Sequence, residues 1–246
     1  MNRYNILIEY VGTNFIGWQT QKKGQSIQKI IQLKISKILK KKIILVGSGR
    51  TDAGVHAIEQ SAHFDLDFKI SNLEKFLQSI NYFLNNKLIS ITKIKKKNLK
   101  FHSRFSAKKR IYKYTIFNRV SIPSIEKNRG WHIKKILDLK LMEKGAKKLL
   151  GTKNFSTFRA SSCSARSPIK TMYAIKIKKF KSKIEIRFIS QSFLQNQVRS
   201  MVGCLKYLAE KKWNLKMFEK VLKSKKRSLC APPAPAHGLY LEKVIY

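Results

Sequence analysis

One order of strands and helices occurs twice along this chain of 246 residues, and the repetition limits the folds that it can adopt. Apolar spacing in the first half predicts, in order, a strand at 5–10, a helix at 27–39, strands at 43–46 and 60–64, a helix at 73–84 and a strand at 88–94. Period-2 and period-3.6 patterns thus alternate in a fixed sequence. We expect each set of elements to form one compact unit.

The second half repeats this order. It predicts a strand at 111–117, a helix at 139–150, strands at 171–180 and 183–190, a helix at 194–208, an extra helix at 215–222 and a strand at 239–245. Two such sets predict an α+β fold of two ferredoxin-like (βαββαβ) units. We expect an N-terminal unit at 1–100 and a C-terminal unit at 101–246. Their antiparallel sheets would join side by side, with a central cleft between the halves.

Local signals mark the ends of three of these helices. Ser26 is placed to cap the helix at 27–39. Ser71 and Glu74 match a capping box for the helix that follows them. Gly151 has the position favoured after a helix C-terminus. We therefore expect the side chains of Ser26 and Ser71 to accept backbone hydrogen bonds.

Positive charge dominates the composition, with 53 Lys and Arg against 13 Asp and Glu, a formal net charge of +40. Such a field attracts polyphosphates and speeds their encounter with the protein. Lys, Ile and Asn are abundant throughout the chain, which is typical of a genome biased toward A and T. Compositional drift is therefore an alternative source of part of the charge. Positions where Arg, Gly or Asp interrupt this background carry more information.

Several features bear on the compartment. No stretch approaches about 18 consecutive apolar residues, so we expect no membrane-spanning helix. The first ten residues run directly into a predicted strand and lack the layout of a signal peptide. Cys163, Cys204 and Cys230 are far apart and show no spacing typical of metal ligands. We predict a cytoplasmic protein with reduced thiols and no metal.

The loop at 47–54, Gly-Ser-Gly-Arg-Thr-Asp-Ala-Gly, is the first segment that could carry chemistry. Asp52 is one of few aspartates in the chain and lies two residues after Arg50. Glycines allow close backbone approach to a ligand, and a nearby Arg keeps a carboxylate ionised. An ordinary Gly/Asp turn between two strands has the same composition. Spacing alone leaves both interpretations open.

Two further segments could contact a ligand. The segment at 104–114 passes from basic residues into a strand that alternates aromatic and basic side chains. That pattern suits RNA phosphates and unpaired bases, or a strand whose tyrosines pack in the core. The segment at 193–203 opens a helix with Gln195, Asn196 and Arg199. Arg199 needs an anionic partner if it is buried and is solvated if it is exposed.

Taken together, these segments resemble the tRNA pseudouridine synthases of the TruA type along essentially the whole chain. The signature of that family is matched by Gly49-Arg50-Thr51-Asp52-Ala53-Gly54-Val55-His56. Further matches follow in order: Phe101–Ala107, Tyr112–Tyr114, Asn154–Arg159, Phe193-Leu194 with Val198-Arg199 and Val202-Gly203, and Gly238–Leu241. The length and order of these matches make a chance similarity negligible.

The resemblance implies an enzyme that isomerises uridine to pseudouridine at positions 38, 39 and 40 in the anticodon stem-loop of tRNA. Asp52 takes the place of the catalytic aspartate, and Tyr112 that of the tyrosine that stacks on the target base. Arg50 and Arg199 match basic residues that flank the aspartate or guide the flipped nucleotide. The resemblance also implies a homodimer that binds tRNA, with no cofactor and no metal.

The match leaves a few positions to consider. Leu239 or Leu241 would contribute to the apolar wall of the site. The family usually has histidines where this chain has Gln195 and Asn196, and often has Arg where it has Lys170. These changes concern RNA affinity rather than chemistry. The alternatives are a family member that has lost its activity and a non-catalytic RNA-binding protein.

Pseudouridine formation breaks the bond from ribose C1′ to uracil N1 and forms one from C1′ to C5. Nothing is oxidised or reduced, so we expect no redox cofactor. The carboxylate of Asp52 attacks a carbon covalently, or abstracts a sugar proton toward a glycal, and the sequence leaves both routes open. Extrusion of the target base costs a few kcal/mol, which a stacking aromatic such as Tyr112 offsets.

Overall fold

The computed structural model describes residues 1–246, which divide into two compact units. Unit 1 contains Met1–Lys108 and Tyr240–Tyr246, and unit 2 contains Lys109–Leu239. Unit 1 is therefore built from two separate stretches of chain. Its first stretch extends beyond the boundary expected at residue 100. The last strand, which the sequence pattern assigned to the C-terminal half, is grouped almost entirely with unit 1.

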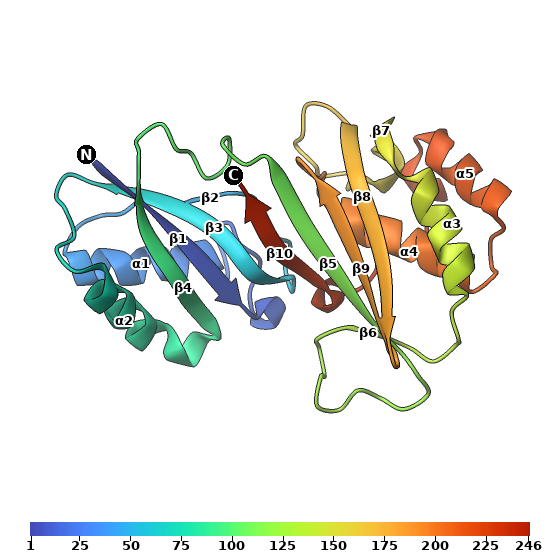
Figure 1. The fold of residues 1–246 in the computed structure, drawn as a ribbon, viewed down its shortest axis with the longest axis horizontal. Coiled ribbons are helices and arrows are strands. Elements are labelled where there is room, and N and C mark those ends of the chain that lie inside the picture. The colour runs from blue at the N-terminus through green and yellow to red at the C-terminus, as the bar shows by residue number, and fades with distance from the viewer. The chain divides into compact units, whose positions relative to one another are not determined.

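Unit 1 contains the six elements that the first half predicts, in the predicted order, and one strand from the end of the chain (Figure 1). Their bounds are β1 (Asn2–Tyr10), α1 (Ile27–Leu39), β2 (Val46–Gly47), β3 (His56–Leu66), α2 (Leu73–Leu84), β4 (Ile89–Lys97) and β10 (Leu239–Ile245). β1 pairs with β3 and β4 in antiparallel fashion, and β2 is antiparallel to β3. β10 runs parallel to β3.

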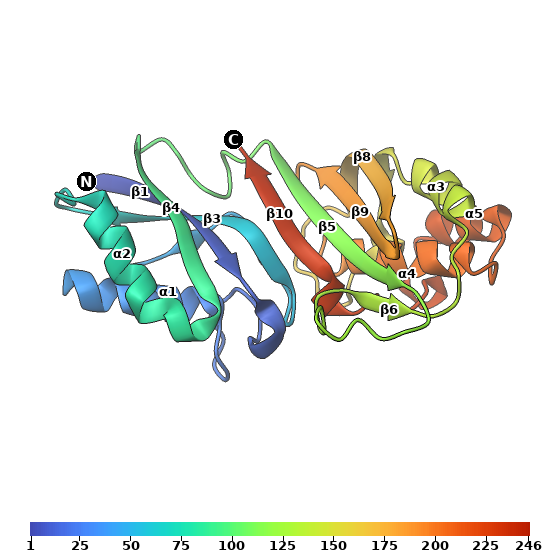
Figure 2. The ribbon, with the colours of Figure 1, turned by 60° about the horizontal axis from the view of Figure 1, so that its bottom comes forward.

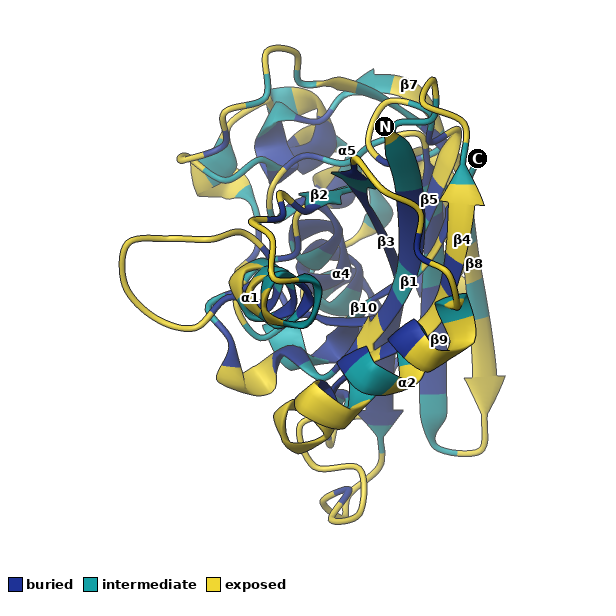
Figure 3. Cartoon of the chain, turned by 90° about the vertical axis from the view of Figure 1, so that its left-hand side faces the viewer, coloured by how far each residue is buried: buried dark blue, intermediate teal, exposed yellow.

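The core of unit 1 lies between this sheet and the two helices that cover one of its faces. Ile6 and Ile8 on β1 and Ile31 and Ile35 on α1 are completely buried. The period-2 pattern of the strand and the helical spacing each gather apolar side chains on one face. Figure 3 shows the buried residues of β1 and β3 and the exposed residues on the outer surfaces of α1 and α2. Each buried isoleucine stabilises the fold by about 1.5–3 kcal/mol.

The predicted helix caps in unit 1 have different outcomes. Ser26 caps α1 as expected, because its side chain accepts a backbone hydrogen bond from the first turn. The capping box predicted for Ser71 and Glu74 is wrong. Asn72 is the N-cap of α2, and its Oδ1 accepts the backbone N–H of Lys75 at 2.9 Å. Asn and Ser are equally good caps, so the sequence signal did not distinguish two adjacent candidates.

The strand predicted at 43–46 is reduced to β2, the two residues Val46–Gly47. The backbone N–H groups of Ile43 and Leu45 donate to side-chain oxygens of α1 instead of to a neighbouring strand. Ile43 and Leu45 are nevertheless buried. Their apolar pattern therefore reports burial under a helix rather than pairing in a sheet.

Unit 2 contains an antiparallel sheet in the order β5-β9-β8-β7, with β6 parallel to β5. The bounds are β5 (Lys109–Asn118), β6 (Trp131–Ile133), α3 (Leu139–Lys148), β7 (Gly151–Asn154), β8 (Ile169–Phe180), β9 (Lys183–Ser190), α4 (Gln197–Ala209) and α5 (Leu215–Ser224). The three helices pack together on one face of this sheet (Figure 2). The sequence pattern did not predict the short strands β6 and β7.

Helix α4 forms the centre of the core of unit 2. Its fully buried side chains are Met201, Val202, Cys204, Leu205 and Leu208. The helix was predicted to begin at Leu194, and that start is wrong by three residues. Asn196 has a φ of 62° in the left-handed region, which a right-handed helix does not include. The backbone N–H of Leu194 donates instead to the side chain of Gln197 at 2.8 Å.

Both units are α+β with mainly antiparallel strands, as the repeated pattern predicts. No helix of the structure has the length and apolar character needed to cross a membrane. All three cysteines are free thiols. The Sγ atoms of Cys204 and Cys230 lie 3.4 Å apart, a proximity that their spacing in the sequence did not indicate.

Candidate active site

The loop that carries Asp52 begins where β2 leaves its pairing with β3. The backbone N–H of Ser48 donates to the carbonyl of Ser61 at 2.7 Å, and its hydroxyl donates to Oε1 of Gln60 at 2.7 Å. Nε2 of Gln60 in turn donates to the carbonyl of Gly49 at 3.0 Å. Gln60 is completely buried, so one side-chain amide fixes the first residues of the loop.

The residue before Asp52 is held from another direction by the segment at 10–18. The hydroxyl oxygen of Tyr10 lies 2.8 Å from Oγ1 of Thr51. The backbone N–H of Trp18 donates to the carbonyl of Thr51 at 3.1 Å. Tyr10, Trp18 and Thr51 are all buried. The backbone that enters Asp52 is therefore fixed by one side-chain contact and one backbone contact.

Gly17 permits the close approach of these two segments. Its φ is +107°, and a Cβ at this position would lie 2.6 Å from the carbonyl oxygen of Thr51. Another residue would be strained and would press against the loop. On the far side of Asp52, the backbone N–H of Val55 donates to the Asp52 carbonyl at 3.1 Å. Asp52 itself is half-buried and is the first residue of this tight turn.

The end of the loop is anchored by His56 at the start of β3. Nδ1 of His56 accepts the backbone N–H of Gly12 at 3.0 Å. Its ring stacks on Tyr240 of β10 with centroids 4.7 Å apart and an interplanar angle of 27°. A Cβ on Gly12 would collide with the carbonyl of Val55. The end of the loop is therefore held by β3, through His56, and by β10, through Tyr240.

Arg50 and Asp52 lie close in the sequence but differ in their surroundings. Arg50 is exposed, whereas Asp52 is half-buried. None of the ion pairs in the structure involves Arg50. The effect of Arg50 on the ionisation of Asp52 stays a prediction. The guanidinium of Arg50 is open to an anionic ligand such as a phosphate.

Tyr112 lies on β5 of unit 2, opposite Phe188 of β9. Its ring is 8% exposed and meets the edge of Phe193, with centroids 5.0 Å apart at 82°. Tyr114 is completely buried, and its hydroxyl donates to the carbonyl of Pro235 at 2.9 Å. Burial raises the pKa of Tyr114 well above its ordinary value. The interpretation that the tyrosines of this segment pack in the core therefore holds for Tyr114, and Tyr112 is buried as well.

Arg199 lies in the first turn of α4 and is half-buried. Its Nε donates to the carbonyl of Ala234 at 2.7 Å, and its Nη1 donates to Oδ1 of Asn196 at 3.1 Å. The backbone N–H of Ala234 donates back to the Arg199 carbonyl at 3.0 Å. Two neutral oxygens thus orient the guanidinium.

The two amides that precede Arg199, Gln195 and Asn196, have different positions. Gln195 is exposed, and its carbonyl accepts the backbone N–H of Ala160 at 3.0 Å. Asn196 orients Arg199, as described above. His237 is half-buried, and burial together with the charge of Arg199 lowers its pKa. Asn196 therefore makes a polar contact to the arginine.

Leu239 and Leu241 are both buried. Leu241 on β10 pairs with Ala57 of β3.

No group of three or more His, Cys, Asp or Glu side chains is close enough to hold a metal ion.

Several residues that hold the loop of Asp52 or orient Arg199 were not predicted from the sequence. These are Tyr10, Gly17, Trp18, Gln60 and Ala234. One signal was present, because Gly17 and Trp18 interrupt the Lys/Ile/Asn background in the same way as the loop at 47–54. Gln60 carried no such signal, because its role depends on a contact across the strand pairing.

Comparisons with known proteins agree with this arrangement of segments. A family described as tRNA pseudouridine synthase matches residues 6–106 and 146–246. The chain is 71% identical over all 246 residues to tRNA pseudouridine synthase A of Pelagibacter ubique (strain HTCC1062), covering 100% of each protein. It is 38% identical over the same length to tRNA pseudouridine synthase A of Parvibaculum lavamentivorans, again covering 100% of each.

Proposed function

Since the chain belongs to the tRNA pseudouridine synthase family, an isomerase family that converts uridine to pseudouridine in tRNA, we propose that Asp52 is its catalytic carboxylate. In this proposal Tyr112 stacks on the target base. Arg50 and Arg199 bind the phosphates that flank the extruded nucleotide. The target positions are 38, 39 and 40 in the anticodon stem-loop.

One observation carries the assignment of Asp52. Its backbone is held between the Trp18–Thr51 hydrogen bond on one side and the turn closed by Val55 on the other. Catalytic groups act best when they are preorganised, because no free energy is then spent on ordering them during the reaction. A half-buried carboxylate on such a fixed turn meets this requirement. An ordinary surface turn has no need of a buried Tyr10–Thr51 contact.

The reaction requires one carboxylate and no external reagent. The C1′–N1 bond breaks, the detached uracil turns, and C1′ bonds to C5. The proton on C5 is then lost, and N1 gains one, so that atoms balance in the isomer. The carboxylate of Asp52 serves either as a nucleophile or as the base that removes a sugar proton. Both roles need the ionised form.

Tyr112 has the properties that a stacking residue needs. Its ring is supported by Phe193 at its edge and lies on a strand rather than on a loop. Stacking of a base on an aromatic ring contributes about 1–3 kcal/mol, which offsets the cost of extrusion. The oriented guanidinium of Arg199 and the exposed one of Arg50 suit phosphate oxygens, which arginine binds in a bidentate manner.

The proposal extends to the partners and the compartment. We infer a homodimer that acts on tRNA in the cytoplasm without a small-molecule cofactor. Sedimentation equilibrium of the purified protein tests the dimer. A single species with the mass of one chain at micromolar concentration would contradict it.

The decisive experiment measures pseudouridine in an unmodified tRNA transcript after incubation with the purified protein. Asp52→Asn keeps the size of the side chain and removes its charge. We expect pseudouridine formation to fall by about 10²–10⁴-fold or more. The affinity for tRNA should stay within about threefold. Carbodiimide treatment followed by reverse transcription locates the modified positions, which we expect at 38, 39 and 40.

Asp67→Asn is the matched control, because Asp67 is an exposed carboxylate of the same unit that pairs with Lys41. This variant should retain the wild-type rate. Turnover by Asp52→Asn near the wild-type rate would remove Asp52 from its proposed role. If the wild-type protein binds tRNA but forms no pseudouridine, the chain has lost the activity of its family.

A second pair of variants tests the stacking residue. Tyr112→Phe keeps the ring, so we expect tRNA binding to persist. Tyr112→Leu removes the flat face and should weaken binding or slow the reaction by about fivefold or more. Equal behaviour of Tyr112→Leu and the wild type would exclude stacking on this residue.

A further inference from the structure

The ring of Phe105 is 75% exposed, although it lies in a tightly bonded turn that follows β4. It is supported by the imidazole of His102, with ring centroids 4.4 Å apart and an interplanar angle of 35°. The guanidinium carbon of Arg104 lies 5.5 Å from the centre of the same ring. An exposed aromatic ring with a cation over it is thus presented to the surroundings of unit 1.

The support beneath this ring is rigid. Nδ1 of His102 accepts the backbone N–H groups of Arg104 at 3.1 Å and Phe105 at 3.3 Å. The backbone N–H of His102 donates to Oγ of Ser106 at 2.9 Å, and its carbonyl accepts the backbone N–H of Ser106 at 2.9 Å. Burial and the charges of Arg3 and Arg104 lower the pKa of His102, which keeps Nδ1 available as an acceptor.

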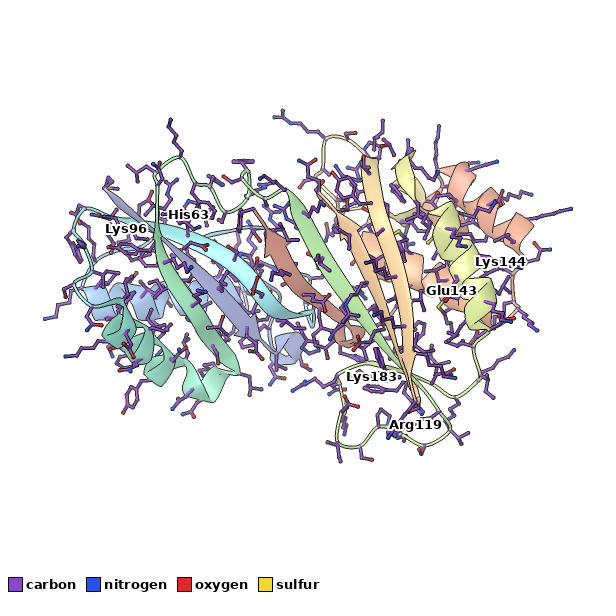
Figure 4. The ribbon with its side chains drawn as sticks, viewed as in Figure 1. His63, Lys96, Arg119, Glu143, Lys144 and Lys183 are labelled. Carbon is purple, nitrogen blue, oxygen red and sulfur yellow. The ribbon has the colours of Figure 1, made fainter.

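The same turn is tied to the loop that carries Asp52. The hydroxyl of Ser103 donates to the carbonyl of Val46 at 2.6 Å, and Val46 opens the strand that leads into that loop. The backbone N–H of Ser103 donates to Nδ1 of the buried His63 at 3.2 Å. Figure 4 shows His63 on β3, the strand that pairs with β2. The position of the exposed ring is therefore fixed relative to Asp52 within unit 1.

The charges of the segment that carries the ring indicate the class of ligand. All charged residues from 91 to 108 are cations: Lys93, Lys95, Lys96, Lys97, Lys100, Arg104 and Lys108. Lys96, labelled in Figure 4, lies near the end of β4. A cationic surface with an exposed ring binds a polyanion that also has flat apolar groups. Single-stranded nucleic acid has both, since its phosphates meet the cations and its bases stack on the ring.

We propose that His102, Arg104 and Phe105 form a stacking platform for an unpaired nucleobase of the tRNA substrate, distinct from the base that reacts at Asp52. The proposal rests on the proposed function, because it takes tRNA as the ligand. Phe105 stacks on the base, His102 supports the ring from within the turn, and Arg104 binds the adjoining phosphate. The platform adds affinity and places the RNA relative to the loop of Asp52.

The first test compares the affinities of full-length variants for an unmodified tRNA transcript by fluorescence anisotropy. Phe105→Leu keeps an apolar side chain and removes the ring. We expect its Kd to rise by about fivefold to 150-fold, which corresponds to one stacked base. Phe105→Tyr keeps the ring and should bind within about twofold of the wild type. Phe68→Leu alters another exposed phenylalanine of unit 1 and is the matched control, with an unchanged Kd.

The second test identifies the base itself. An anticodon stem-loop RNA is prepared with a single abasic residue at each loop position in turn. Wild-type protein should lose affinity at one non-target position by the same factor that Phe105→Leu loses on the intact RNA. The Phe105→Leu variant should be insensitive to the abasic residue at that position. Such non-additivity is the signature of a direct contact.

Two results would overturn the platform. One is a Phe105→Leu variant that binds every RNA as the wild type does. The other is a change in the sedimentation of Phe105→Leu without RNA, which would make this face an interface between copies of the chain. These measurements of binding do not depend on pseudouridine formation, so failure of the platform and failure of the role of Asp52 remain distinguishable.

Discussion

The hydroxyl oxygen of Tyr10 lies 2.8 Å from the hydroxyl oxygen of Thr51, the residue directly before Asp52. Tyr10 is the last residue of β1, so this contact joins the centre of the sheet of unit 1 to the candidate catalytic loop. Both side chains are buried, where polar groups are nearly always hydrogen-bonded. The position of Asp52 therefore depends on a strand about 40 residues away in the chain.

Tyr10→Phe removes one partner of this pair and leaves the hydroxyl of Thr51 buried. We expect a loss of about 1–3 kcal/mol in the free energy of unfolding. Looser positioning of Asp52 should also slow pseudouridine formation at saturating tRNA by about tenfold. Urea denaturation and single-turnover kinetics measure the two effects.

Tyr4→Phe is the control for this change. The hydroxyl of Tyr4 accepts the backbone N–H of Ile70 at 2.9 Å, also in the core of unit 1 but at another loop. It should lower stability by a similar amount and leave the single-turnover rate unchanged. Equal rates for Tyr10→Phe and Tyr4→Phe would show that the contact to Thr51 does not position Asp52.

Gly17→Ala introduces a Cβ 2.6 Å from the carbonyl of Thr51 at a φ of +107°. Backbone strain of this kind costs about 1–3 kcal/mol, and the neighbouring atom is backbone that cannot rotate away. We expect lower stability and a reduced rate of pseudouridine formation, because relief of the clash displaces the loop. Gly24→Ala also has a positive φ, but its Cβ meets the flexible side chain of Ile16. This control should lose stability and keep its rate. A Gly17→Ala variant with an unchanged rate, or a Gly24→Ala variant with a reduced one, would contradict the role of Gly17.

Asn196→Gly tests the amide that orients Arg199. Glycine tolerates the φ of 62° at this position, so the change removes the hydrogen bond to Nη1 without adding strain. We expect affinity for tRNA or the reaction rate to fall by about fivefold, the effect of one charge-assisted hydrogen bond. Asn128→Gly makes the same exchange at a φ of 58° and serves as the control. If Asn196→Gly and Asn128→Gly have the same tRNA affinity and the same reaction rate, Asn196 does not contribute through Arg199.

The buried histidine of β3 predicts a pH dependence of stability. Burial, together with the charges of Arg3 and His102, lowers the pKa of His63 to about 4. The fold thus favours neutral His63, whose contribution is complete above the ordinary pKa of about 6.5 and is lost as the pH falls toward 4. Chemical denaturation should show a stability slope of up to about 1.4 kcal/mol per pH unit in that window that His63→Gln lacks. Parallel curves for the two proteins would contradict this assignment.

Most of the fold follows from local patterns, and its exceptions have physical causes. The spacing of Ile31 and Ile35 predicts α1, and the alternation in β1 predicts its buried face, because each element presents one apolar side. The start of α4 was not predictable, because the left-handed conformation of Asn196 interrupts an apolar pattern that continues through Leu194. Apolar periodicity reports burial and does not report backbone conformation.

The candidate site divides in the same way. The residues expected to act on the substrate, Asp52 and Arg50, stand out because their types are rare in this composition. The residues that hold the loop, Tyr10 and Gln60, are ordinary in type, and their roles arise from contacts between distant segments. The spacing of residues in the sequence does not predict such contacts.

The parallel pairing of β10 with β3 has a consequence for biosynthesis. Residues 109–238, which precede β10, build unit 2, so a ribosome makes them between the two stretches of unit 1. Unit 1 therefore lacks one strand of its sheet, and the ring that stacks on His56, until translation has passed the whole of unit 2. Domains usually mature in the order in which they are synthesised, but here unit 1 is completed only after unit 2. The loop of Asp52 therefore acquires its final support last.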